Sequence, residues 1–110
     1  MTDLITNICA LRLEQKESRN LLPPQQITKW ITQAESRISY LKLINPAAES
    51  DEYMEADCLI SNLDEIQDMR ANIIWDDAFD GAGDISLMTV KEAAIYRILS
   101  DKACELRGEA

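Results

Sequence analysis

The feature that most constrains the fold is the stretch from Ser50 to Phe79, which contains neither Gly nor Pro. Nothing in it interrupts a helix, because Gly and Pro are the residues most unfavourable in a helix interior. Its apolar residues recur at three- and four-residue spacings, which place them on one side of a helix. They are Ala56, Leu59, Ile60, Leu63, Ile66, Ile73 and Ile74. The pattern predicts one long helix, closed by the Gly-containing turn at residues 80–84, with a single stripe that other helices must cover.

The same region concentrates the negative charge of the chain. Residues 49–84 hold 12 acidic residues against one basic residue, Arg70, a net charge of −11. Residues 1–48 carry +2 and residues 85–110 carry 0, which gives the chain total of −9. Binding to nucleic acid or to an anionic membrane needs clustered Lys and Arg. We therefore expect no direct nucleic-acid contact and no membrane contact, and a protein with a basic surface as the favoured partner.

Two further helices are predicted before this stretch, over residues 3–20 and Pro24–Ile44. The second has the clearest apolar period in the chain, because its apolar residues fall within one narrow arc of a helix. They are Ile27, Trp30, Ile31, Ala34, Ile38 and Leu41. Pro24 suits the first helical turn, where its missing N–H costs nothing. Asn45 precedes Pro46 and is pushed out of the helical conformation, so the helix is expected to end there.

A last helix is predicted from the capping-box spacing of Thr89 and Glu92. It should continue to Arg107, and Gly108 suits the residue that closes a helix. Its expected inner face consists of Ile95, Ile98, Leu99 and Leu106.

These four helices predict an all-α fold, because no stretch shows the alternation of a strand. With 110 residues, the chain has the length of one domain. We expect a single helical domain over residues 1–110, a compact up-down bundle of about four helices whose third is long and acidic. Arg70 lies on the apolar stripe of that third helix. It is expected to pair with a carboxylate of another helix or to extend to the edge of the core.

The face opposite the apolar stripe of the long helix is the candidate binding site. It combines carboxylates with soft or aromatic apolar side chains, a mixture that suits contact with another protein better than contact with water alone. Its members are Met54, Asp57, Asp64, Glu65, Asp68, Met69, Trp75 and Asp76.

The residues available argue against catalysis and against a cofactor or a metal ion. The chain has no His, so a zinc site and a histidine base are not expected. An EF-hand alignment on Gly81 places Asp76 and Asp80 correctly but puts Ala78 and Leu87 at ligand positions. The pairs Glu52/Glu55 and Glu65/Asp68 have the i, i+3 spacing found in Mg²⁺-dependent all-α nucleotide pyrophosphatases. Both pairs lie on one helix without a basic phosphate clamp, and this enzyme class is the least favoured alternative.

Two short segments resemble known families. Residues 88–94 resemble the opening of excisionase-type DNA-binding helices, but Ile95–Leu99 extends the same helix where that family has a Gly-containing turn. Gln33–Leu41 resembles a helix of small tailed-phage head–tail adaptor subunits, and this resemblance implies a structural subunit of an assembly. Such a homo-oligomer could use the strip formed by Met54, Cys58 and Met69 as its subunit contact.

We therefore expect a non-catalytic protein-binding module. Its acidic helix, about residues 50–79, would dock on a basic partner as an inhibitor or adaptor, and a protein that normally binds nucleic acid is one such partner. The alternative is the homo-oligomeric structural subunit. An odd number of well-separated cysteines, Cys9, Cys58 and Cys104, indicates a reducing compartment, so a cytoplasmic location is expected.

Overall fold

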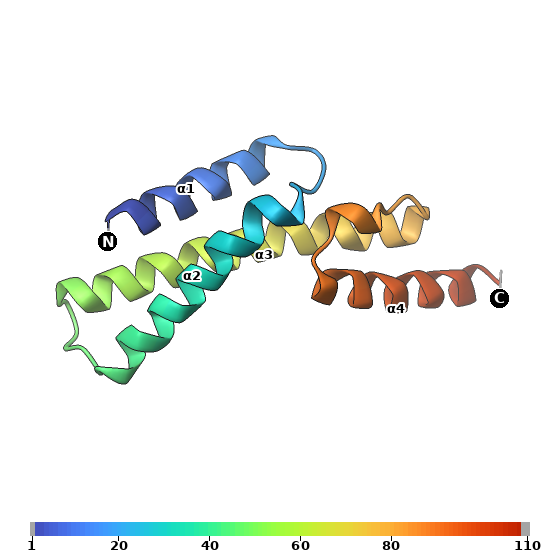
Figure 1. Cartoon of the computed structure of the whole chain (residues 1–110). Coiled ribbons are helices and arrows are strands. Elements are labelled where there is room, and N and C mark those ends of the chain that lie inside the picture. Colours follow the sequence, from blue (N-terminus) through green and yellow to red (C-terminus); the bar gives the residue numbers. More distant parts are fainter. Residues whose placement is uncertain (1, 109–110) are drawn as a thin grey trace.

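The computed structural model describes residues 2–108 and contains four α-helices and one short 3₁₀ helix (Figure 1). They are α1 (Thr2–Glu17), α2 (Pro24–Leu43), α3 (Asp51–Asp80), η1 (Ile85–Leu87) and α4 (Val90–Arg107). No strand occurs within the described residues. The predicted all-α bundle of four helices with a long, acidic third helix is confirmed. The first helix is shorter than expected, because it ends at Glu17 and not near Asn20.

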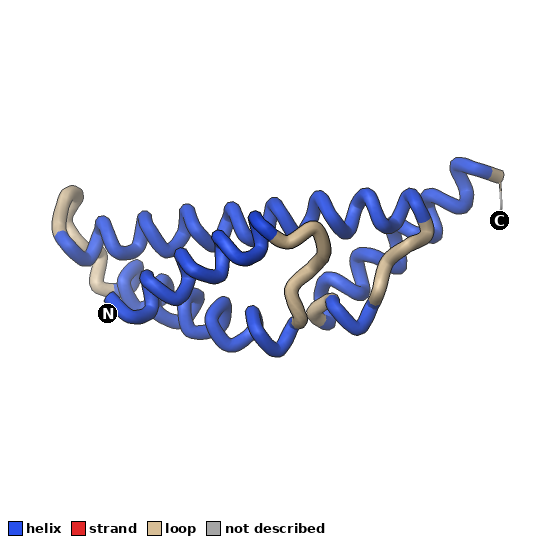
Figure 2. Tube along the Cα trace, turned by 90° about the horizontal axis from the view of Figure 1, so that it is seen from above, coloured by secondary structure: helices blue, strands red, loops and turns tan. Residues whose placement is uncertain are grey.

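The long helix α3 is the element against which all the others pack. The described residues extend over 54 × 24 × 19 Å. Both α1 and α2 lie along the first part of α3, and α4 lies along its last part (Figures 1 and 2). Three α-helices, α1, α2 and α4, therefore pack on one long helix, and α4 makes most of its contacts with α3 alone.

Cross-helix contacts define the directions of the helices. Contacts of Arg12 with Glu65 and of Gln15 with Arg70 show that α1 runs parallel to α3. The chain then reverses twice, so α1, α2 and α3 alternate in direction (Figure 1). Residues 81–89 fold back along the end of α3, and α4 then runs in the same direction as α3 (Figures 1 and 2). The up-down alternation thus applies to the first three helices, and α4 is the exception.

Local signals in the sequence set the helix ends. The Ser50 hydroxyl accepts from the Tyr53 N–H at 3.2 Å and caps α3, and Gly81 ends α3 with a left-handed φ of 67°. Thr89 and Glu92 form the predicted capping box at the start of α4, and Gly108 closes that helix.

The apolar side chains form two clusters at different levels of α3. The first joins α1, α2 and the first half of α3, and its buried members are Ile8, Leu11, Ile27, Ala34, Ile38, Leu59, Leu63 and Ile66. The second joins the end of α3 to η1 and α4, and its buried members are Leu21, Ile74, Ala78, Met88, Ala93 and Tyr96. The predicted stripes of α2 and α3 thus supply most of the first cluster, and the stripe of α3 adds Ile74 to the second.

The predicted inner face of α4 is wrong. The structure buries Ala93, Tyr96 and Ala103, whereas Ile95, Ile98 and Leu106 are 46%, 61% and 78% exposed. Of the four residues expected to face inward, Leu99 alone packs against the second cluster.

The contact between Tyr96 and Gly83 explains this rotation of α4. The Tyr96 hydroxyl accepts from the Gly83 N–H at 3.1 Å, and a Cβ on Gly83 would lie 2.3 Å from the Tyr96 ring. Only glycine therefore lets the ring lie so close to the backbone. Two small residues, Ala93 and Ala103, occupy the same side of α4 and are buried with Tyr96.

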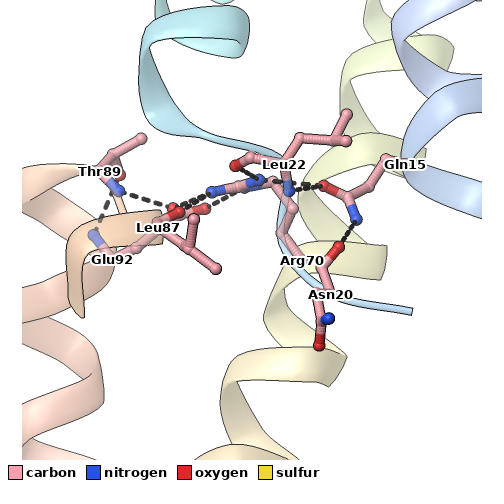
Figure 3. Close-up of polar contacts among 7 residues, drawn as sticks. All are labelled: Gln15, Asn20, Leu22, Arg70, Leu87, Thr89 and Glu92. Atoms are coloured by element: carbon pink, nitrogen blue, oxygen red, sulfur yellow. Dashed lines mark hydrogen bonds and ion pairs between the residues drawn. The ribbon is translucent and has the colours of Figure 1, made fainter. Parts of the chain in front are cut away.

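Arg70 connects the two clusters, and its five N–H groups are all hydrogen-bonded (Figure 3). Its Nε and Nη2 atoms donate to the two carboxylate oxygens of Glu92 in α4, both at 2.7 Å. Its Nη1 atom donates to Gln15 of α1 and to the Leu22 carbonyl, and Nη2 also donates to the Leu87 carbonyl, each at 3.0 Å. The expectation that Arg70 pairs with a carboxylate of another helix is confirmed.

We predict that Arg70→Ala lowers the free energy of unfolding by about 3–5 kcal/mol, because it leaves buried polar partners without a counter-charge. Urea unfolding followed by circular dichroism measures this loss. Arg12→Ala is the matched control: its pair with Glu65 is partly exposed, with side chains 27% and 59% accessible. That control should lose at most about 1 kcal/mol. Equal losses in the two variants would contradict the role assigned to Arg70.

Candidate interaction surface

An exposed row of aspartates runs along the outer side of α3. Asp57, Asp64 and Asp68 are exposed, and Trp75, also exposed, continues the row. The four positions are separated by seven, four and seven residues, which places them on one line along a helix of 3.6 residues per turn. We call these four residues the acidic ridge.

The other predicted site residues lie apart from the acidic ridge. Glu65 faces α1, where its carboxylate pairs with Arg12 at 3.0 Å. Met69 is half-buried, whereas Met54 is 61% exposed near the start of α3. Asp76 lies beside Trp75, on the rim of a shallow hollow that Phe79 and Asp80 complete. The structure thus separates an outer row of acidic residues from the edge of α3 beside α1, a division that the sequence alone did not predict.

The aspartates of the ridge carry uncompensated charge. Within residues 2–108, the ion pairs engage the carboxylates of Glu55, Glu65, Glu92 and Glu105. None of these pairs involves Asp57, Asp64 or Asp68. The three ridge carboxylates therefore remain available to a cation from outside the chain.

Aromatic side chains end the ridge. The rings of Trp75 and Phe79 lie 5.3 Å apart between centroids, and their side chains are 51% and 40% exposed. Aromatic side chains with this much free area are the type that anchors protein interfaces. The ridge thus combines charge along its length with an apolar anchor at one end.

A groove of about 680 Å³ lies next to the ridge, between α2, α3 and α4. Trp75 belongs to both features. The polar rim includes Glu35 of α2 and Lys91 of α4. The apolar lining consists of Ile31, Ala71, Ile74, Trp75, Ile95 and Leu99. Sequence reasoning missed this groove because it depends on the direction and the rotation of α4.

Two acidic groups, one on α4 and one on α3, have pKa values displaced in opposite directions. Burial by itself raises the pKa of Glu92, but hydrogen bonds from Arg70 and from the Thr89 backbone outweigh it, so the pKa lies below its ordinary value of 4.5. Burial, with Asp80 and Asp76 close by, raises the pKa of Asp77 above its ordinary value of 3.8.

The carboxylates considered as magnesium ligands have other partners. Arg37 donates to both oxygens of Glu55, at 2.7 and 3.0 Å, and Glu65 is held by Arg12. Each candidate i, i+3 pair therefore has one carboxylate in an ion pair with Arg. The residues that the structure describes contain no group of three or more His, Cys, Asp or Glu side chains able to hold a metal ion.

The strip proposed for a homo-oligomer is partly covered by α1. Cys58 and Met69 are half-buried. Burial, together with the neighbouring Cys9 thiol of α1, raises the pKa of the Cys58 thiol. Met54 alone among the three strip residues is more than half exposed, so the strip offers little continuous area.

No protein-family model matches this chain, and no curated protein matches it either. Among residues 2–108, no helix combines the length and the apolar character that crossing a bilayer requires. The ridge and the groove are therefore the features of this chain that bear on function.

We predict that the stabilising effect of Glu92 depends on pH. Because its folded pKa is lowered, the stabilisation is present above the ordinary value of 4.5 and is lost as the pH falls through the folded pKa. Glu92→Gln should therefore be less stable than the wild type at neutral pH, and the two should converge as the pH falls. Urea midpoints measured across the acidic range check this.

Asp77→Asn is the control of opposite sign. Because the pKa of Asp77 is raised in the folded state, the charged carboxylate lowers the stability of the wild type. The Asn variant should therefore be more stable than the wild type at neutral pH. That advantage should disappear below the ordinary value of 3.8, where both forms are uncharged. A constant difference between wild type and Glu92→Gln at all pH values would contradict the linkage.

Proposed function

We propose that this chain is a non-catalytic protein-binding module whose acidic ridge docks on a basic surface of another protein. The observation that carries the proposal is the alignment of Asp57, Asp64 and Asp68, exposed and unpaired within residues 2–108, with an exposed aromatic residue at the end of the row. A row of carboxylates that has no counter-ions from its own chain can pair with Lys or Arg side chains of a partner.

Charge and aromatic area have different roles in such a contact. Exposed carboxylates attract a basic partner over distance and raise the association rate. Trp75 and Phe79 add apolar area, which contributes most of the affinity once the partners meet. The carboxylate row and the aromatic pair suit an inhibitor or an adaptor, since neither role needs a chemical reaction on the bound partner.

A protein whose usual ligand is nucleic acid is the partner class that we favour. Asp64 and Asp68 are about 6 Å apart along the axis and Asp57 about 10 Å from Asp64, by the rise of 1.5 Å per residue. A partner that grips phosphates presents Lys and Arg in rows, and such a row can align with separated carboxylates. The chain would then compete with nucleic acid for that basic surface.

A cytoplasmic location is part of the proposal. Cys9, Cys58 and Cys104 are all free thiols, which fits a compartment in which thiols remain reduced.

We predict that Asp57→Asn/Asp64→Asn/Asp68→Asn weakens binding to a basic partner by about tenfold or more, with a flatter dependence of affinity on salt. The partner is first captured from the native host with the wild-type chain and purified. Titration calorimetry at several salt concentrations then gives the affinity and the salt slope.

The control variant removes the same number of charges away from the ridge. Glu17→Gln/Glu49→Gln/Glu52→Gln changes three exposed carboxylates, one on α1, one in the turn before α3 and one in the first turn of α3. It should retain most of the affinity. If both triple variants lose affinity equally, net charge and not the ridge is responsible, and the proposal is wrong.

A further inference from the structure

The outward side of α4 carries exposed apolar side chains among charged ones. Val90, Ile98 and Leu106 are 91%, 61% and 78% exposed, and Ile95 is 46% exposed between them and the groove. The opposite side of the helix packs on α3 through Ala93, Tyr96 and Ala103. At about 100° per residue, Val90 and Leu106 lie on opposite edges of this side, about 160° apart, and Ile98 lies at its middle. We call the outward line through Lys91, Ile98 and Glu105 the α4 strip.

Charged residues are placed symmetrically along this strip. Lys91, Ile98 and Glu105 are separated by seven residues each, close to two helical turns, so they lie on one line. Ile98 is at the middle, with a base seven residues before it and an acid seven residues after it. Ala94 and Lys102 flank the line at equal distances of four residues from Ile98.

This arrangement is complementary to itself. In a two-fold contact, residue i of one copy meets residue j of the other, and residue j meets residue i. Two α4 helices packed antiparallel with Ile98 at the two-fold axis bring Lys91 of each copy opposite Glu105 of its partner. Lys102 then lies over the small Ala94 of the other copy, where its aliphatic stem can cover apolar surface. We propose that this chain forms a homodimer through antiparallel contact of the α4 strips.

A second copy fits the strip better than a basic partner does. Lys91 and Lys102 lie on this strip, so a surface rich in Lys and Arg would meet like charge there. A second copy supplies both the apolar area and the matching acids, Glu105 above all. The intrachain contact of Lys102 with Glu105 is exposed and long, at 3.4 Å, and exposed pairs of this kind contribute little, so it leaves Glu105 free to exchange partners.

This proposal is independent of the acidic ridge. The ridge lies on the outer side of α3, and none of Asp57, Asp64 and Asp68 belongs to the strip on α4. A dimer through α4 would present two ridges and could bind two basic sites at once.

The test is the mass of the whole chain in solution, measured by light scattering behind gel filtration and by sedimentation equilibrium over a range of concentrations. The wild type should reach twice the chain mass of 12.5 kDa. Ile98→Asp should remain monomeric, because it places two carboxylates at the axis. Its far-ultraviolet circular dichroism and melting should stay close to wild type, since Ile98 is 61% exposed.

Charge exchange tests the register. Lys91→Glu alone and Glu105→Lys alone each put like charges opposite one another twice per dimer, and each should raise the dissociation constant about tenfold. Lys91→Glu/Glu105→Lys together should restore dimerisation. Arg97→Glu, an exposed change outside the strip, is the control and should leave the dimer intact.

Three results would overturn the proposal. They are a wild-type chain that is monomeric at all concentrations, a dimer that persists in Ile98→Asp, and a double variant that dimerises no better than the single ones. Because each single exchange puts a charge of favourable sign near a helix end, neither should unfold the monomer.

Discussion

The buried guanidinium of Arg70 is the interaction on which the rest of the structure depends. A charge that is 1% exposed is tolerable only when every polar atom around it is satisfied. Here its donors reach α1, the loop before α2, the segment that contains η1, and α4 (Figure 3). Each of these elements must be in place for all the donors of Arg70 to be hydrogen-bonded. A single side chain therefore determines how the two apolar clusters meet.

This constraint also shapes the functional surfaces. Because the Nε and Nη2 atoms of Arg70 hold Glu92, the start of α4 is fixed beside α3, and the groove opens between α4 and α2. The rotation of α4 then leaves Ile95 and Ile98 outward. The ridge needs no such arrangement, since it lies on the side of α3 that no other helix covers. The acidic ridge therefore depends on the local sequence of α3, whereas the groove and the outward side of α4 depend on tertiary contacts.

The same distinction explains what the sequence could predict. The helix positions, the capping box at Thr89 and the pairing of Arg70 follow from local rules: apolar period, side-chain capping and the cost of an isolated buried charge. The rotation of α4 does not. Its residues offer two stripes with helical spacing, one through Ile95, Ile98 and Leu106 and another through Ala93, Tyr96 and Ala103. The more hydrophobic stripe was the natural prediction, but the contact of Tyr96 with Gly83 and the Arg70 pair selected the other. The arginine partner of Glu65 was equally hidden, because it comes from a helix distant in sequence.

We infer that Arg70 joins the two clusters into one cooperative unit that holds the ridge, the groove and the α4 strip in fixed relation. Native-state hydrogen exchange tests it most directly, because it measures the opening free energy of each helix separately. The slowest amides of α4 and of α1 should exchange with the same free energy, equal to that of global unfolding. A value for α4 well below that of α1 would show that α4 opens on its own, and would contradict the claim.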